Sequence, residues 1–156
     1  DYLDIVLAGF HDGTGYSGST LEENTEAMVA AIKNPYVHVI THPGNPKYPV
    51  DVETVVRAAR DYNKALELNN SSFIVRPGSF PLCSEFAKMA KKYNTLVSIN
   101  SDAHICYNVG ENAKAVALAS KEGIRKSQIL NSSAHNLSEY LNWHKQQSSL
   151  VLKKAQ

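Results

Sequence analysis

The feature that most constrains the fold is a regular alternation of short apolar stretches with longer stretches that have helical spacing. A short apolar stretch that leads into a loop predicts a buried strand. Such stretches occupy residues 4–9, 37–41, 65–69 and 96–100, and residues 129–130 predict a short last strand. The repeated order of strand, loop and helix indicates an α/β fold in which parallel strands alternate with helices.

The helix boundaries are marked by side chains that can cap a first turn. Ser19 with Glu22, or Thr20 with Glu23, has the spacing of a capping box before a helix that ends near Lys33. The other predicted helices are 51–62 capped by Asp51, 79–93 capped by Ser79, 112–121, and 136–146 capped by Asn136.

The length of 156 residues is enough for one domain with a real core, and 43% hydrophobic with 20% charged residues is typical of a globular chain. Four or five strand–helix units do not close an eight-stranded barrel, which needs about 200 residues or more. The pattern therefore fits either an open doubly wound sheet or part of a barrel whose first units are absent. We expect residues 1–156 to form a single, partial domain.

Composition also restricts the partners and the compartment. The net charge is +1 and no apolar run approaches the roughly 20 residues of a membrane helix, so we expect neither nucleic acid nor membrane as a partner. Cys83 and Cys106 are not closely spaced, which is typical of a reduced, cytoplasmic protein. Because the chain opens with Asp1 and runs almost directly into an apolar stretch, we expect an upstream segment.

Ionisable residues follow three of the predicted strands. His11 follows the first strand and His42 follows the second, whereas Asp102 and His104 follow the fourth. Parallel strands end at one edge of a sheet, where α/β enzymes build their active sites. Imidazole and carboxylate groups that meet there suit Zn²⁺, Mn²⁺ or Fe²⁺, so the sequence predicts a metal site at this edge.

Several of these residues also have a structural interpretation. A lone His11 is more often a hydrogen-bonded loop residue, and His42 could simply cap a turn rich in Pro and Gly. Glu67 is an acid within an apolar strand, and a buried carboxylate needs a partner. It either binds metal or accepts structural hydrogen bonds. We expect the remaining ionisable or nucleophilic candidates to lie outside the site: His38 packed, His135 and His144 solvated, and Cys83 in a helix core.

An anion site is a further possibility. Arg76 precedes a predicted helix that starts near Gly78 and Ser79, and a helix N-terminus beside a guanidinium favours phosphate. The alternative is a surface arginine next to an ordinary cap. Asn70 could line the same pocket or belong to a turn, and we take Arg76 and Asn70 as candidate substrate contacts.

Four stretches together resemble a known family: 9–11 (GFH), 40–46 (ITHPGNP), 66–72 (LELNNSS) and 101–104 (SDAH). They look like the PHP (polymerase and histidinol phosphatase) superfamily, and most like the YcdX-type phosphatases within it. The likeness runs in order from Asp1 to about Leu141. It implies the C-terminal part of a distorted (βα)7 barrel with up to three metal ions, usually zinc, that hydrolyses phosphoesters.

On that resemblance, His11 and His42 match two ligands of one metal. Asp102 matches a ligand of a second metal and His104 a ligand of the third. The family's opening His-x-His motif, two further histidines and a bridging glutamate precede the matched region, so this chain holds fewer than half of the expected ligands. We therefore expect a missing N-terminal segment or a second copy of the chain as a partner, because a sheet without its early strands leaves an open edge.

The leading hypothesis is a metal-dependent phosphatase in which metal-activated water cleaves a small phosphomonoester. No catalytic residue beyond the metal ligands is predicted. The first alternative is a non-catalytic remnant that binds metal or a partner, or one half of a split protein. The second alternative is an amidohydrolase-type enzyme that acts on C–N bonds with a similar layout at the strand ends.

Overall fold

The computed structural model describes residues 3–16 and 18–154, with side chains up to residue 147. Within this part the strands are β1 (Leu7–Ala8), β2 (Val39–Ile40), β3 (Ala65–Asn69) and β4 (Val97–Asn100). The α-helices are α1 (Leu21–Lys33), α2 (Val52–Asp61), α3 (Ser72–Val75), α4 (Ser79–Tyr93), α5 (Ala113–Lys121) and α6 (Ala134–Lys154). Short 3₁₀ turns are η1 (Cys106–Asn108), η2 (Lys126–Gln128) and η3 (Leu130–Ser132).

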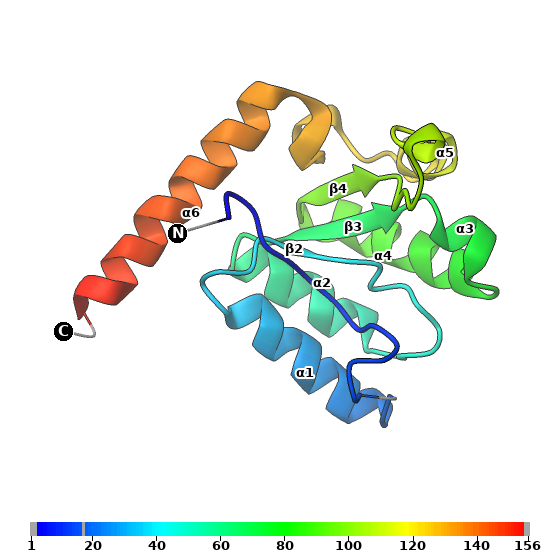
Figure 1. The fold of residues 1–156 in the computed structure, drawn as a ribbon, viewed down its shortest axis with the longest axis horizontal. Helices are drawn as coiled ribbons and strands as arrows, with labels where there is room; N and C mark the ends of the chain where they lie inside the picture. The colour runs from blue at the N-terminus through cyan, green and yellow to red at the C-terminus, as the bar shows by residue number, and fades with distance from the viewer. Residues whose placement is uncertain (1–2, 17, 155–156) are drawn as a thin grey trace.

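The four strands form one parallel sheet in the order β1-β2-β3-β4. Each strand pairs with the next one along the chain, as Leu7 pairs with Val39 and Leu66 with Val97. Right-handed crossovers that always step in the same direction put their helices on one face. Accordingly, α1, α2 and α4 lie side by side on one face of the sheet (Figure 1). The predicted α/β class with parallel strands is confirmed, and the described strands lack the reversal of order that a doubly wound sheet requires.

Strand β3 contributes side chains to both faces of the sheet, and one of these faces is covered by helices. Leu66 and Leu68 are buried in the hydrophobic clusters under α2, α4 and α5. Because side chains alternate along a strand, Ala65, Glu67 and Asn69 face the opposite side. Toward the carboxyl end of β3 this opposite face is therefore polar, although both Glu67 and Asn69 are buried.

Helix α6 covers the other end of that opposite face. Its Tyr140 packs with Val39, Ala65 and Leu130 in a third buried cluster. The Tyr140 hydroxyl donates to the backbone oxygen of His38 at 2.7 Å. In Figure 1 the strand arrows point away from α6 and toward α3 and α5, so α6 closes the end opposite the carboxyl edge.

Local capping explains where the first two helices begin. Thr20 and Glu23 form the predicted capping box of α1, with the Thr20 hydroxyl accepting from the Glu23 N–H at 3.2 Å. Asp51 caps α2 by accepting from the Thr54 N–H at 2.7 Å. Both boundaries depend on contacts within three residues, which a sequence displays directly.

Three predicted boundaries were wrong. Ser79 is the first residue of α4 and not its cap, because Gly78 at φ 83° makes the turn into the helix. Residues 129–130 form no strand: Ile129 makes a single parallel bridge to Val97 between two 3₁₀ turns. Asn136 lies inside α6, which begins at Ala134 and continues to Lys154, beyond the predicted end near residue 146. Within it, Leu137, Tyr140 and Leu141 pack against the sheet.

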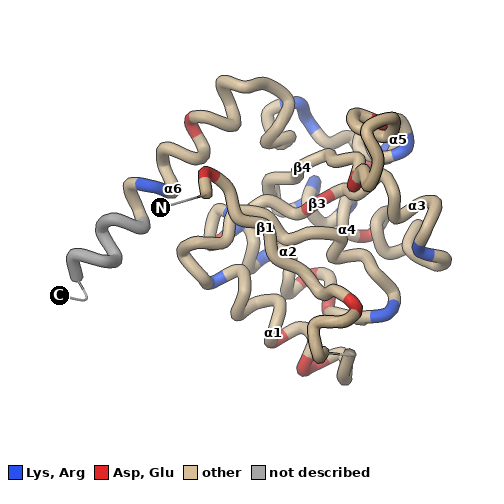
Figure 2. The backbone as a smooth tube through the Cα atoms, viewed as in Figure 1, with Lys and Arg blue, Asp and Glu red and all other residues tan. Residues whose placement is uncertain are grey.

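Figure 2 shows acidic and basic positions interspersed along the described backbone, in keeping with the net charge of +1. None of the helices in the described ranges is both long and apolar enough to span a bilayer.

Candidate active site at the carboxyl edge

The predicted site residues lie on the loops that leave the carboxyl ends of the strands. His11 follows β1, His42 follows β2, and Asp102 and His104 follow β4. Parallel pairing brings these loops to one edge because adjacent strands end together, as the pairing of Asn69 with Asn100 shows.

His11 and His42 form a close pair. Their ring centroids are 4.7 Å apart and the rings meet edge to face at 77°. His42 is 5% exposed, whereas His11 is open to solvent. Burial, the neighbouring charge of Arg76 and the proximity of His11 lower the pKa of His42 to about 4. At neutral pH His42 is therefore uncharged and offers a ring nitrogen lone pair, the form in which imidazole binds a metal ion.

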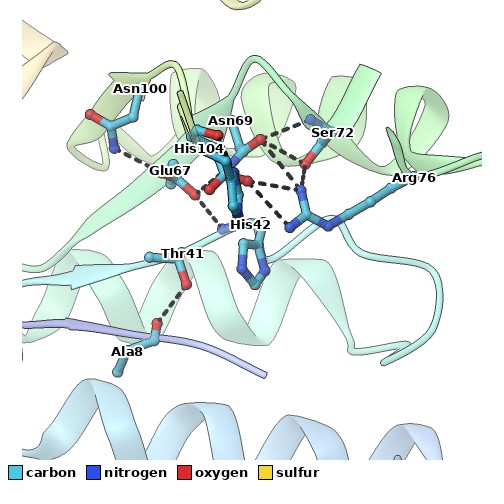
Figure 3. Close-up of polar contacts among 10 residues, drawn as sticks. Ala8, Thr41, His42, Glu67, Asn69, Ser72, Arg76, Asn100 and His104 are labelled. Atoms are coloured by element: carbon cyan, nitrogen blue, oxygen red, sulfur yellow. Dashed lines mark hydrogen bonds and ion pairs between the residues drawn. The ribbon is translucent and has the colours of Figure 1, made fainter. Parts of the chain in front are cut away.

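Arg76 links the loops after β3 and β4. Its Nη1 and Nη2 atoms both lie 3.3 Å from Oδ2 of Asp102. Nη1 also donates to the Ser72 hydroxyl at 3.0 Å and lies 3.5 Å from Oδ1 of Asn69 (Figure 3). The pair is about three-quarters buried, since 21% of the Arg76 side chain and 25% of the Asp102 side chain are exposed. The contacts therefore hold a guanidinium at the edge where the histidine pair also lies.

His104 is exposed and belongs to the same loop as Asp102. Its Nδ1 atom lies 2.9 Å from the backbone oxygen of Asp102, which places the proton on Nδ1 and leaves Nε2 as the nitrogen with a lone pair.

Glu67 accepts three hydrogen bonds, which is the structural role of the two that the sequence left open. Its Oε2 accepts from the backbone N–H of His42 at 2.7 Å and from the amide of Asn69 at 3.1 Å. Its Oε1 accepts from the amide of Asn100 at 2.9 Å. Sequence reasoning did not single out Asn100. The available signal was an amide residue at the end of a predicted strand, two positions before Asp102.

The backbone at the site is unusual. His42 has φ 31° and Asp102 has φ 54°, which places two of the four predicted ligands in the left-handed region. Residues with a side chain adopt this region at a cost, and such residues gather at functional sites. The surrounding hydrogen bonds therefore hold both residues in conformations they would rarely choose in isolation.

Asn70 has its side-chain oxygen engaged. The oxygen accepts from the N–H groups of Lys114 and Ala115, at 2.9 Å and 3.1 Å, in the first turn of α5. Asn70 thereby fixes the start of α5, and its role as a substrate contact stays a prediction.

The residues expected outside the site are placed as follows. His38 is packed as predicted, with Nδ1 accepting from the Val6 N–H at 3.0 Å. Cys83 is buried as predicted, and burial raises the pKa of its thiol to about 11. His135 is exposed as predicted. The prediction for His144 was wrong, because this residue is 2% exposed and packs against Asn63, Lys64 and His38.

The fit of a metal ion depends on how many of these groups converge. Across residues 3–16 and 18–154, no three His, Cys, Asp or Glu side chains come together in an arrangement that could hold one. Two neighbouring imidazoles, one of them kept neutral, do have the chemistry of two nitrogen ligands. The described residues therefore supply two neighbouring nitrogen donors and no set of three groups that could hold a metal ion.

No model of a known protein family matches the chain. A probable phosphatase of Caldanaerobacter subterraneus subsp. tengcongensis is 44% identical over 140 residues, which is 89% of this chain and 55% of that protein. A probable phosphatase of Thermoanaerobacter sp. is 44% identical over 89% of this chain and 57% of its own length. One of Syntrophotalea carbinolica is 43% identical over 89% and 58%. The chain thus spans somewhat more than half the length of relatives that are named probable phosphatases, and it resembles them over nearly all of its own.

Proposed function

We propose that the protein to which this chain belongs is a metal-dependent phosphatase that hydrolyses small phosphomonoesters. The observation that carries the proposal is the meeting, at one strand edge, of the His11–His42 pair with the Arg76 guanidinium. The names of the relatives support phosphate ester chemistry. The metal, zinc in the first instance, is part of the proposal.

In this proposal His11 and His42 supply two nitrogen ligands, and Asp102 and His104 supply further ligands. A divalent ion bound there would neutralise charge on the phosphate oxygens and lower the pKa of an attacking water molecule. Because the pKa of His42 is about 4, its ring is uncharged near pH 7 and can act as a nitrogen ligand.

Arg76 would hold the phosphate group of the substrate. A guanidinium carries five N–H donors in a rigid fork, and in the described part of the chain no contact uses its Nε–H. Asp102 and Ser72 fix the orientation of the fork. A doubly charged phosphate monoester therefore meets a positioned cation and not a freely rotating one.

The rest of the ligand set requires additional strands. We propose that these strands pair with the β1 edge and continue the sheet toward a barrel of the PHP type, either from a preceding segment or from a second copy. Two observations support this: the sheet steps in one direction from β1 to β4, and Leu7 of β1 is 45% exposed. The two free cysteines suit the reducing cytoplasm, which we propose as the compartment.

The test is hydrolysis of p-nitrophenyl phosphate by the protein expressed from its complete reading frame and supplied with Zn²⁺ or Mn²⁺. We expect His42→Ala to lose activity and His135→Ala, a matched change at an exposed histidine, to keep it. Equal activity in both variants would remove His42 from the mechanism, and no hydrolysis by the unaltered protein would refute the phosphatase.

A second candidate function is non-catalytic binding of metal or of a partner. The observation that favours it over multi-metal catalysis is that no three metal-binding side chains converge in the described ranges. Metal analysis of the same preparation separates the two functions, since a phosphatase of the proposed kind holds two or three equivalents and a binding remnant holds one or none.

A further inference from the structure

Glu67 is a buried carboxyl group whose contacts are all with N–H groups. It lies in the middle of β3, is 6% exposed and faces the side of the sheet away from Leu66 and Leu68. No lysine, arginine or histidine side chain within the described residues lies at ion-pair distance from it. A buried carboxylate needs compensation, and three N–H donors provide it.

Those donors belong to three different strand ends. The backbone N–H of His42 follows β2, Asn69 ends β3, and Asn100 ends β4. One side chain thus ties together the starts of the loops that carry the candidate site, and Figure 3 shows it between them.

The first of these contacts is with the backbone N–H of His42, a residue whose φ angle lies in the unfavourable left-handed region. At φ 31° this residue needs its backbone to be held, and the 2.7 Å bond from its N–H to Glu67 is the shortest of the three. The bond fixes the peptide plane from which the imidazole projects toward His11.

The contact with Asn69 extends to the guanidinium. With its amide nitrogen directed at Glu67, Asn69 turns its oxygen toward Ser72 and Arg76. An amide rotated the other way would face Arg76 with an N–H group, which cannot accept a bond. The orientation set by Glu67 therefore reaches Arg76 as well.

We propose that Glu67 is a positioning residue that sets the placement of both the His42 ring and the Arg76 guanidinium without touching the substrate. This inference deepens the proposed function and depends on it for its kinetic consequences. The structural half of the inference, that Glu67 holds the His42 peptide, stands independently of any activity.

The pattern of donors provides a compensated variant. In Glu67→Gln one carboxylate oxygen becomes an NH₂ group that faces a donor. Adding Asn100→Asp replaces the donor next to Oε1 by an acceptor, so the Gln NH₂ regains a partner. The Asn131 amide can still donate to position 100, and the Ser98 hydroxyl, which accepts from Asn100 in the unaltered chain, can donate to the new carboxylate instead. Glu85→Gln, at an exposed position of α4, is the matched control.

The first measurement is the backbone amide proton shift of His42 in ¹⁵N-labelled protein, which requires no turnover. We expect it to move upfield in Glu67→Gln and to return toward its original position in Glu67→Gln/Asn100→Asp, with no change in Glu85→Gln. An unchanged shift in Glu67→Gln would overturn the proposal whether or not the protein is a phosphatase.

The second measurement is p-nitrophenyl phosphate hydrolysis by the same variants, with their melting temperatures. Misplacement of a reacting group by about 1 Å costs roughly 100-fold in rate, so we expect kcat to fall at least tenfold in Glu67→Gln. We expect the double variant to recover most of kcat even if its melting temperature remains low. Loss of kcat that follows melting temperature alone, with no recovery in the double variant, would refute the positioning role. Inactivity of the unaltered protein with the expected amide shifts would refute the phosphatase only.

Discussion

Acidification should destabilise this chain through His144, a buried histidine of α6 that packs against the segments leading into β2 and β3. Its Nε2 lies 2.9 Å from the backbone oxygen of Asn63, which places the proton on Nε2. Its Nδ1 then faces the ammonium group of Lys64 at 3.5 Å, and the ring of His38 lies 5.1 Å away. Adding a proton to Nδ1 puts two cations side by side in a buried space.

The size of the effect follows from the pKa. Burial, with smaller contributions from Lys64 and His38, lowers the pKa of His144 from 6.5 to about 4. The unfolded chain therefore binds more protons between these values, so the stabilisation is present above pH 6.5 and is lost as the pH falls toward 4. The full difference corresponds to about 3 kcal/mol, of which about 2 kcal/mol disappears between pH 7 and pH 5.

The variant that isolates this effect is His144→Gln. Its amide can donate to the Asn63 oxygen and accept from Lys64, yet it does not titrate. The pKa of His42 is also about 4, so both the unaltered chain and His144→Gln lose stability through His42 over the same range. The quantity of interest is therefore the difference between the two proteins.

Urea unfolding followed by far-ultraviolet circular dichroism, at intervals from pH 7.5 to pH 5, measures that difference. We expect the unfolding free energy of the unaltered chain to fall about 2 kcal/mol further than that of His144→Gln across the interval. Parallel curves for the two proteins would show that His144 does not couple folding to protons, and would refute the argument.

Three further predictions concern stability. Leu66→Ala removes a fully buried side chain under α2 and should cost about 2–5 kcal/mol in urea unfolding; a loss below about 1 kcal/mol would contradict the burial. Asp51→Ala removes the acceptor for the Thr54 N–H and should cost about 1 kcal/mol, with no loss expected if the cap is unimportant. Gly44→Ala would place a methyl group 2.9 Å from Sγ of Cys83 and should cost about 1–3 kcal/mol; Cys83→Ala should relieve part of this in the double variant, and strict additivity would exclude the clash.

The histidines show how far the sequence reaches. His11, His42 and His104 could be placed at a strand edge because each directly follows or nearly follows an apolar stretch. The burial of His144 was missed, although His144 continues the helix face of Leu137, Tyr140 and Leu141 at helical spacing. Its partners, Asn63 and Lys64, lie about 80 residues earlier, so the contacts themselves could not be predicted.

The polar network at the carboxyl edge shows the same limit. The sequence marks Glu67 as an acid that needs a partner, but it does not say that the partners are the His42 peptide, Asn69 and Asn100. Nor does it show that Arg76 lies against Asp102. Each of these contacts depends on which strands are neighbours and in what register.

The sequence by itself determined the α/β class, the parallel sheet and the starts of α1 and α2, because periodicity and capping involve residues only a few positions apart. Only the tertiary structure decided which loops meet, which histidine is buried and which conformations His42 and Asp102 adopt. Those properties arise from contacts between segments tens of residues apart, where packing and burial outweigh local preference.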